Sequence, residues 1–362
     1  MIDPAARTVA GIDLAAIRHN TRTLLSRAGG ARLMAVVKAD AYGHGAVQCA
    51  RAALSGGASS LAVVTAEEGA ELRDAGITVP ILVFTDLLPE KLSLAAARGL
   101  TATAHSLPSA RAVADVPNLR AHLKVNTGMN RWGVSPEEVS EARRILGERL
   151  SGVYTHLACA DSDSGATRRQ LDVFDGALSV DSFSGMTVHA ANSAGALWRP
   201  RARYDLVRPG VALYGLHPGG DAGDPYEEGL RPAMKLTSYV AGVRRLSPGD
   251  GVSYGLTFRA GEPMYAATVP CGYAEGYRRT LSNAGVALVR GRRRSVLGRV
   301  TMDAIVVEAD EEVEVGDEVV LIGEQGGERV GAEELGKLAG TINYEITTGV
   351  DPRRVERVWA GG

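Results

Sequence analysis

The first two thirds of the chain alternate short apolar runs with segments of helical periodicity. This pattern is typical of parallel strands joined by helices, because a strand buried on both faces needs a continuous apolar run. After an opening helix around residues 14–28, the apolar runs predict strands at residues 33–38, 60–64, 80–84, 100–104, 120–126, 152–159, 186–191 and 204–208. Between them we expect helices that include residues 66–75, 92–98, 136–150 and 168–178.

Eight strand–helix units over about 200 residues predict a TIM-type (β/α)8 barrel, whose functional groups lie at the carboxyl ends of the strands. An open doubly wound sheet is the alternative topology. No GxGxxG sequence follows the first predicted strand, which counts against the dinucleotide-binding form of such a sheet.

From residue 231 onward the pattern changes to long β-rich runs joined by turns that contain Gly-Asp or Pro-Gly-Asp. Dense strands with such turns are typical of antiparallel sheets. Residues 219–229 are rich in turn formers, so we place the boundary there. The sequence predicts a barrel domain over residues 1–229 and a smaller, mainly antiparallel β domain over residues 230–362.

Composition narrows the class of protein. The 362 residues are 45% hydrophobic with a formal net charge of −2, enough apolar content for two domains and no basic excess for nucleic acid. The run Arg292–Arg294 reads as a solvated turn. The three cysteines lack metal-ligand spacing, so we expect neither a disulfide framework nor a metal site. Residues 1–7 lack a signal-peptide pattern and no apolar stretch is long enough for a membrane span, so we expect a cytoplasmic protein.

Candidate chemistry is concentrated in the segment AVVKADAYGHG, residues 35–45. Its apolar run stops on Lys38, where the core gives way to a cleft and desolvation lowers the pKa of an amine, as a Schiff-base lysine requires. If only the first six residues of this segment are considered, the alternative is that Lys38 is an ordinary exposed lysine at the end of a strand. Tyr42, Gly43 and Gly45 then precede a helical pattern, and a hydroxyl with backbone amides is a usual phosphate site. The segment resembles the pyridoxal-phosphate lysine motif of alanine racemases.

The later predicted strands also end in polar groups, which a barrel would bring together. They provide the segment 122–131, His156, Ser193, Arg208 and Gly210. Taken singly, His156 reads as a core histidine, Ser193 as a helix N-cap and Arg208 as a surface ion-pair residue. Their occurrence at several strand ends favours a shared site.

The resemblance to alanine racemases extends over nearly the whole chain. The matching motifs, in family order and spacing, are AVVKADAYGHG, HLKVNTGMNR, YTHLACAD, HAANSAG, VRPGVALYG, VSYG, GYAEGYRR, MD at residues 302–303 and TINYE. The resemblance implies a pyridoxal 5'-phosphate-dependent enzyme that interconverts L-alanine and D-alanine and supplies D-alanine for peptidoglycan. It also implies a homodimer whose active sites are shared between subunits.

The resemblance further implies a role for each matching residue. Lys38 would hold the cofactor as an imine and act as one base, and Tyr254 would be the other. Arg208 would face the pyridine nitrogen with His156 behind it. The phosphate would be bound by Tyr42, Ser193, Tyr344 and the backbone at Gly210 and Val211. Substrate contacts would come from Arg131, Met302 and Tyr273.

Elementary chemistry supports these roles. Racemisation removes a proton from one face of Cα and returns it to the other, so two acid–base groups must flank the substrate. A guanidinium stays protonated in proteins, so Arg208 would not pass a proton to the ring nitrogen as a carboxylic acid could. The resulting weaker electron sink suits racemisation better than transamination.

The chain departs from the family pattern at Asn126 and Asn130, where the family usually has an aspartate and a glycine. Lys124 matches a position that is carbamylated in many members, and the neutral amide of Asn126 leaves open whether Lys124 is modified here. The Ser- and Gly-rich residues 162–167 read as a surface loop.

Two other functions fit part of the pattern. A related pyridoxal-phosphate barrel enzyme, such as a racemase of larger amino acids, a decarboxylase or a D-amino acid aldolase, would share the barrel motifs. A non-catalytic cofactor-binding protein would resemble the barrel alone. Tyr254 in VSYG, together with Met302 and Asp303 in the predicted β domain, favours the alanine racemase interpretation.

Overall fold

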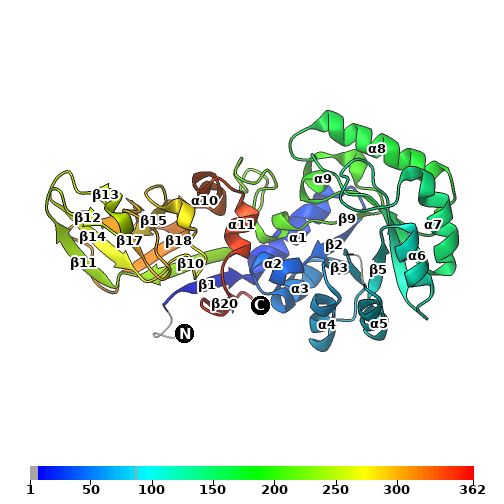
Figure 1. Cartoon of the computed structure of the whole chain (residues 1–362), viewed down its shortest axis with the longest axis horizontal. Helices are drawn as coiled ribbons and strands as arrows, with labels where there is room; N and C mark the ends of the chain where they lie inside the picture. Colours follow the sequence, from blue (N-terminus) through cyan, green and yellow to red (C-terminus); the bar gives the residue numbers. More distant parts are fainter. Residues whose placement is uncertain (1–6, 86–87) are drawn as a thin grey trace. The chain divides into compact units, whose positions relative to one another are not determined.

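The computed structural model describes residues 7–85 and 88–362 and consists of two compact units (Figure 1). The barrel unit contains residues 17–41 and 46–213. The sheet unit contains residues 42–45, residues 214–362 and the described residues before 17. The domain boundary between residues 229 and 230 stays a prediction. The N-terminal residues 1–6, on which the signal-peptide argument partly rests, lie outside the described residues.

The barrel unit is a closed barrel of parallel strands, which confirms the predicted topology over the open sheet. Its strands are β2 (Arg32–Val36), β3 (Ser60–Val63), β4 (Ile81–Val83), β5 (Thr101–Ala104), β6 (Arg120–Lys124), β7 (Leu150–Tyr154), β8 (Thr187–His189) and β9 (Leu206–Val207). Pairing of β2 with β9 closes the ring, with Arg32 opposite Leu206 and Leu33 opposite Val207.

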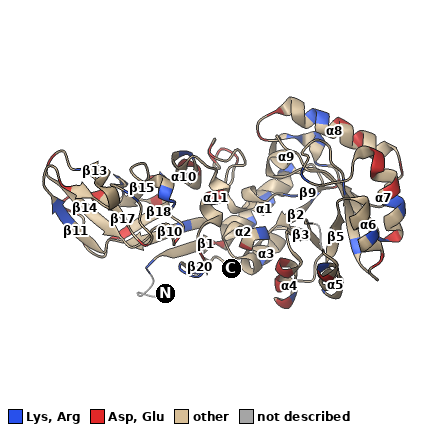
Figure 2. Ribbon diagram, in the orientation of Figure 1, with Lys and Arg blue, Asp and Glu red and all other residues tan. Residues whose placement is uncertain are grey.

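Helices surround these strands, and charged residues mark several of them (Figure 2). They are α1 (Leu14–Arg27), α3 (Ala46–Ser55), α4 (Ala66–Asp74), α5 (Pro89–Ala97), α6 (Leu107–Ala114), α7 (Val139–Leu146), α8 (Ser164–Ser179) and α9 (Ser193–Trp198). The helix α4 starts with a capping box, in which the Thr65 hydroxyl accepts from the Glu68 amide while the Glu68 carboxylate accepts from the Thr65 amide. None of the helices among the described residues is long and apolar enough to cross a membrane.

Two predictions about helices were wrong. Residues 164–167, predicted as loop, form the first turn of α8, because the Asp163 carboxylate accepts from the amides of Gly165 and Ala166 and caps the helix. The single helix predicted over residues 136–150 is α7 flanked by the 3₁₀ turns η1 (Pro136–Glu138) and η2 (Gly147–Arg149). Gly147 has a φ of 52°, which ends α7.

The sheet unit is mainly antiparallel, as predicted, with one parallel pair. Its largest sheet has the order β16-β15-β18-β10-β1-β20, with β19 paired to β18. These strands are β16 (Arg292–Ser295), β15 (Val286–Val289), β18 (Glu318–Gln325), β10 (Met234–Tyr239), β1 (Val9–Asp13), β20 (Glu356–Ala360) and β19 (Glu328–Val330). The pairing of β1 with β20 is parallel. The N-terminal strand is therefore part of this sheet and not of the barrel.

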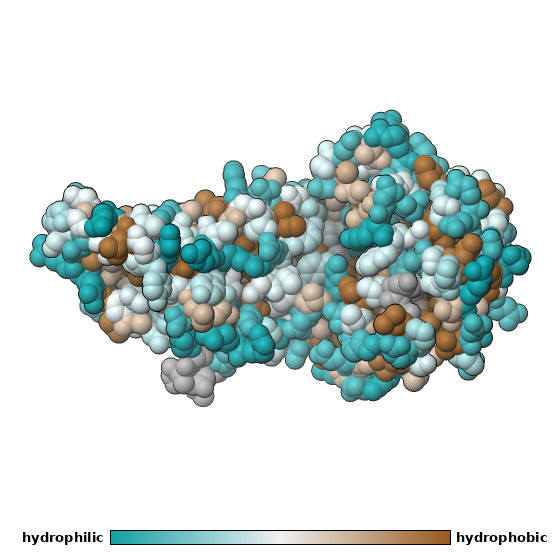
Figure 3. All heavy atoms as spheres, viewed as in Figure 1, coloured by the Kyte–Doolittle hydropathy of each residue, from teal (hydrophilic) through white to brown (hydrophobic). Residues whose placement is uncertain are grey.

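Smaller elements complete the sheet unit. They are a three-stranded sheet of β11 (Gly242–Leu246), β14 (Met264–Val269) and β17 (Ile305–Ala309), the pair β12 (Gly251–Val252) and β13 (Phe258–Arg259), and the helices α10 (Ala332–Ala339) and α11 (Asn343–Thr348). On the face drawn in Figure 3, hydrophobic residues are scattered among hydrophilic ones.

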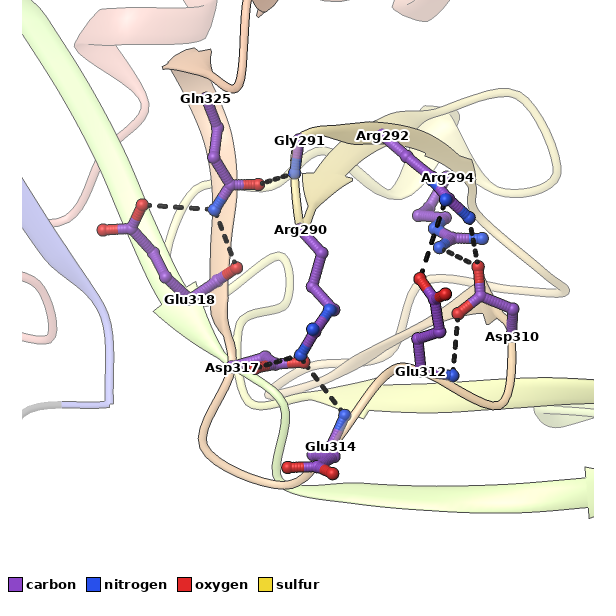
Figure 4. Close-up of polar contacts among 10 residues, drawn as sticks. All are labelled: Arg290, Gly291, Arg292, Arg294, Asp310, Glu312, Glu314, Asp317, Glu318 and Gln325. Carbon is purple, nitrogen blue, oxygen red and sulfur yellow. Dashed lines mark hydrogen bonds and ion pairs between the residues drawn. The ribbon is translucent and has the colours of Figure 1, made fainter.

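The arginine run is not the solvated turn that the sequence predicted. Arg292–Ser295 is strand β16, and the turn before it is formed by Arg290 and Gly291, both with positive φ. Figure 4 shows Arg292 and Arg294 directed at Asp310. The Arg294 side chain is 8% exposed and that of Arg292 is 61% exposed. These arginines are paired with carboxylates of their own unit, which leaves little charge for an external anion.

These two arginines provide a matched test of burial. Arg294→Ala should lower the free energy of unfolding by about 2 kcal/mol, because it leaves the partly buried Asp310 carboxylate without its main partner. Arg292→Ala should cost less than about 1 kcal/mol, because its ion pair with the same carboxylate is solvated. Urea unfolding of both variants measures the difference, and equal losses would contradict this account.

Candidate active site

The backbone after β2 takes an unusual course. Ala39, Asp40, Ala41 and Tyr42 have φ values of 50°, 50°, 55° and 55°, which makes the segment α2 (Lys38–Tyr42) a left-handed turn. Non-glycine residues avoid this region because of steric repulsion at Cβ, and consecutive examples mark functional sites more often than ordinary loops. Lys38 begins this turn, so the site lysine is presented by strained backbone.

Three hydrogen bonds within the barrel unit hold the turn. The amide of Ala39 donates to Oε1 of Glu68 at 2.7 Å. The amide of Ala41 donates to the carbonyl of Val37 at 2.9 Å. The Asp40 carboxylate accepts from the amide of Ala46 at 2.8 Å.

Lys38 is partly buried, and burial lowers the pKa of its amine. The nearby Arg131 guanidinium lowers this pKa further, whereas the Glu68 carboxylate opposes the shift. A lowered pKa raises the neutral fraction of the amine, which is the form that attacks a carbonyl carbon.

Arg208 is buried after β9 and donates to groups without formal charge. Its guanidinium contacts Nδ1 of His189 at 2.8 Å and the carbonyls of Thr155 and Ala190 at 2.8 and 3.0 Å. Nδ1 of His156 lies 3.4 Å away, and burial lowers the pKa of Arg208 to about 10. Within residues 7–85 and 88–362, no carboxylate hydrogen-bonds to this arginine, so its charge is left for another partner.

The sequence prediction missed His189, which begins the HAANSAG motif and connects Arg208 to His122. Because a guanidinium only donates, Nδ1 of His189 must accept, and its Nε2 then carries the proton toward Nδ1 of His122 at 2.8 Å. Burial and Arg208 hold the pKa of His189 well below its ordinary value and that of His122 at about 3. Burial and the same arginine keep the pKa of His156 well below its ordinary value. All three imidazoles are therefore neutral.

Considered by itself, Ser193 was expected to be a helix N-cap, but it does not cap its helix. The cap of α9 is Asn192, whose side chain accepts from the amide of Gly195 at 2.9 Å. The Ser193 hydroxyl instead accepts from the amides of Gly210 and Ala212 at 2.9 and 3.3 Å. A hydroxyl and two backbone amides thus converge at one point. Val211, which lies between Gly210 and Ala212 in the sequence, is buried.

Lys124 is a second buried amine, at the end of β6. Its Nζ lies 5.6 Å from the Trp132 ring and 5.7 Å from the Tyr154 ring. Burial, followed by Arg131 and Arg208, lowers its pKa to about 8. The Arg131 guanidinium lies 5.3 Å from the same Trp132 ring. The sequence prediction did not single out Trp132, although it follows Arg131 directly.

The two departures from the family pattern form one hydrogen-bonded unit. Nδ2 of Asn126 donates to Oδ1 of Asn130 at 2.9 Å, and Oδ1 of Asn126 accepts from the amides of Gly128 and Asn130. Asn130 has a φ of 56°, a conformation that glycine adopts most easily and asparagine tolerates. The amide pair therefore keeps the turn that an aspartate and a glycine could form.

The sheet unit brings Tyr42 and Tyr344 together. Their ring centroids are 6.2 Å apart, and the Tyr214 ring lies 5.1 Å from that of Tyr42. Tyr42 is buried, and burial raises the pKa of its hydroxyl, so the group stays protonated and can donate. Gly43 is required beside it, because a Cβ there would lie 2.2 Å from the carbonyl of Thr347.

Tyr254, Tyr273 and Met302 of the sheet unit are exposed, at 74%, 41% and 57%. Backbone contacts connect their loops. The Ser253 hydroxyl donates to the carbonyl of Arg299, and the amide of Ala274 donates to the carbonyl of Met302. The sites predicted from sequence thus fall into two groups, one in each unit, and the two candidate bases Lys38 and Tyr254 belong to different units.

Comparison with known proteins decides the family. The model of the alanine racemase N-terminal domain matches residues 12–218, and that of the alanine racemase C-terminal domain matches residues 233–359. The chain belongs to the alanine racemase family. Members of this family are isomerases, so the chain is an enzyme.

Curated relatives match over the full chain. The chain is 43% identical to an alanine racemase of Symbiobacterium thermophilum, with 99% of each chain covered. It is 39% identical to alanine racemase 1 of Bacillus subtilis, covering 96% of this chain and 91% of the relative.

Solved structures match as well. The alanine racemase of Streptomyces lavendulae superposes with a TM-score of 0.91 at 38% identity, covering 99% and 98% of the two chains. That of Bacillus anthracis, solved with bound L-Ala-P, gives 0.90 at 33% identity, covering 99% and 96%.

The buried Lys124 amine leads to a pH-dependent stability. Because its pKa is lowered in the folded state to about 8, the ammonium is disfavoured on folding, and this cost is relieved as the pH rises from 8 toward the unfolded value of 10.5. Lys124→Met should stabilise the cofactor-free protein at pH 7, on the order of 2 kcal/mol, and less at pH 10.

Urea unfolding at both pH values measures this effect, with the exposed Lys337→Met as control. A gain that is absent at pH 7 would contradict a free amine at Lys124.

Proposed function

We propose that the chain interconverts L-alanine and D-alanine with pyridoxal 5'-phosphate, using Lys38 and Tyr254 as the two bases. The observation that carries this proposal is the group of cationic side chains at the barrel strand ends, where Lys38 has a lowered pKa and buried Arg208 contacts no carboxylate of the described residues. Family membership across both units supports the reaction.

The residues present fit this cofactor. The Ser193 hydroxyl oxygen accepts from the Gly210 and Ala212 amides, which leaves its own proton to donate to a phosphate, and Val211 lies within the same turn. The protonated hydroxyl of Tyr42 and the neighbouring Tyr344 are further phosphate donors. The lowered pKa of Lys38 increases the fraction of neutral amine that can attack the aldehyde carbon. When bound, the cofactor supplies a conjugated ring that withdraws electrons from Cα of the amino acid.

Arg208, with His156 beside it, would set how strongly the ring of the cofactor withdraws electrons. We propose that the Arg208 guanidinium hydrogen-bonds to the pyridine nitrogen without transferring its proton. Its neutral partners, His189 and His156, support this role, because none of them can take up a proton easily at neutral pH. A ring nitrogen held by such a donor is less electron-withdrawing than a pyridinium, which favours racemisation.

The substrate is proposed to be alanine, with Arg131 binding its carboxylate. Tyr273 and Met302 would narrow the entry, so a larger side chain should fit poorly. The Bacillus anthracis relative with bound L-Ala-P supports a small amino acid. The supply of D-alanine for peptidoglycan, a cytoplasmic location and carbamylation of Lys124 remain predictions.

We also propose a homodimer in which Tyr254 of one subunit completes the site that contains Lys38 of the other. Exposure supports this arrangement. Tyr254 is 74% exposed, and Leu256, Tyr273 and Met302 are also exposed, on loops joined to each other by hydrogen bonds. Exposed apolar and aromatic side chains of this kind are typical of surfaces that a partner covers.

Tyr254→Phe tests the two-base mechanism. It should reduce proton removal from one enantiomer of alanine by about 10²-fold or more, because the phenol oxygen on one face is lost, while cofactor binding is unchanged. Deuterium incorporation from heavy water into each enantiomer, measured separately, gives the two rates. Tyr239→Phe, at another exposed tyrosine of the sheet unit, is the control. Equal, mild losses in both directions would contradict the assignment.

Mixing two inactive variants tests the shared site. Lys38→Ala and Tyr254→Phe subunits refolded together should recover about a quarter of wild-type activity, because about half of the dimers are heterodimers and each has one intact site. Either variant alone should be inactive. Formation of D-alanine is the assay, and no recovery despite demonstrated heterodimers would mean that both residues act within one chain.

A further inference from the structure

We propose that Glu68 is a positioning residue for Lys38, holding the left-handed turn that presents the Lys38 amine to the cofactor. The inference rests on the proposed function, since it takes Lys38 as the residue that binds pyridoxal phosphate. Glu68 lies in the first turn of α4, after β3, which is the strand next to β2 in the barrel.

The Glu68 carboxylate joins two strand ends. Oε1 accepts from the amide of Ala39 at 2.7 Å. Oε2 accepts from the amides of Val64 and Thr65 at 2.7 and 3.1 Å. One anion thus satisfies three backbone donors, and hydrogen bonds to a charged acceptor are roughly twice as strong as neutral ones.

The turn needs such support because its backbone is strained. Each non-glycine residue in the left-handed region costs about 1–2 kcal/mol, and Ala39, Asp40 and Ala41 are consecutive. The bond from Ala41 to Val37 and that from Ala46 to Asp40 join residues close in sequence. The bond from Ala39 to Glu68 instead joins the start of the turn to the neighbouring strand–helix unit.

Helix capping alone does not explain this geometry. The capping box of α4 needs only the pair between Thr65 and Glu68, in which the Thr65 hydroxyl accepts from the Glu68 amide at 3.1 Å. Oε1 of Glu68 takes no part in the capping box and accepts from the amide of Ala39, the residue after Lys38. A cap that served only the helix would leave this oxygen to solvent.

Charge gives the same carboxylate a second effect on Lys38. The ionisable groups around the amine are Arg131, which disfavours the ammonium, His156, which is neutral, and Glu68, which favours the ammonium. Removal of the Glu68 charge should therefore lower the pKa of Lys38 further. A change in the pKa of Lys38 distinguishes a positioning role of the Glu68 carboxylate from a purely structural one.

The experiment compares Glu68→Gln and Glu68→Asp with Glu67→Gln. Glutamine keeps the shape but places an amide donor against backbone donors, and aspartate keeps the charge but is too short to reach both strand ends. Glu67 is the exposed neighbour in the same helix turn and pairs with Lys91. Far-UV circular dichroism checks folding of each variant.

Two readouts are measured. The first is the affinity for pyridoxal phosphate, from the fraction of Lys38 peptide that carries the cofactor after borohydride reduction at increasing cofactor concentrations. The second is the pH midpoint of Lys38 acetylation by trace acetic anhydride in the cofactor-free protein, read by peptide mass spectrometry with Lys337 as internal standard.

We expect cofactor affinity to fall about tenfold in Glu68→Gln and Glu68→Asp, and to be unchanged in Glu67→Gln. The acetylation midpoint should fall by about half a pH unit in Glu68→Gln only. Wild-type affinity in both folded Glu68 variants would overturn the proposal, as would equal effects of Glu67→Gln. If glutamine prevents folding, the affinity of the aspartate variant decides. Wild-type protein in which borohydride labels no Lys38 would instead refute the proposed function.

Discussion

The concentration of positive charge at the strand ends of the barrel is the constraint on which the rest of the site depends. Lys38, Lys124, Arg131 and Arg208 gather there. Burial lowers the pKa of Lys38, Lys124 and Arg208, and the Arg131 charge lowers the pKa of the two lysines further. The histidines packed against Arg208 respond by staying neutral. Glu68 is the carboxylate that acts on Lys38, and it is already bonded to three amides. Such a site is suited to an anionic ligand, and a phosphate and a substrate carboxylate are the anions that the proposed reaction would bring.

Hydrophobic periodicity was enough to predict the barrel, because each buried strand needs an apolar run and each helix an apolar stripe. The same pattern extended strands too far at their carboxyl ends. The first strand was predicted to reach residue 38, whereas β2 ends at Val36. Apolar residues continue past the last ladder bond, since they still pack in the core after the backbone turns away. The functional groups begin where the ladder stops, so the error falls on the residues of interest.

Other features were out of reach for pattern reasoning. The bond between Glu68 and Ala39 depends on a left-handed turn. Alanine and tyrosine, which make up most of that turn, do not favour the conformation, and the single aspartate is too weak a signal to predict it. The contact between His189 and Arg208 depends on the pairing of β8 with β9 in the barrel. By contrast, the helix start at Ser164 could have been predicted, because Asp163 is a good N-cap residue. It was missed because the Ser- and Gly-rich composition of this segment is typical of loops.

The sheet unit stores strain around its exposed tyrosine. Ser253, Gly255 and Leu256 have φ values of 61°, 75° and 48°, so the backbone around Tyr254 lies in the left-handed region on both sides. Close packing maintains this conformation, since a Cβ on Gly298 would lie 2.5 Å from the carbonyl of Val252. A strained backbone conformation persists only where the surrounding structure holds it in place. A side chain that was simply solvated would not need a backbone held in this way. The loop therefore fixes a large aromatic side chain in an exposed position, which would reduce the entropy lost if the proposed dimer forms. An exposed and preorganised phenol is what the proposed shared site would require.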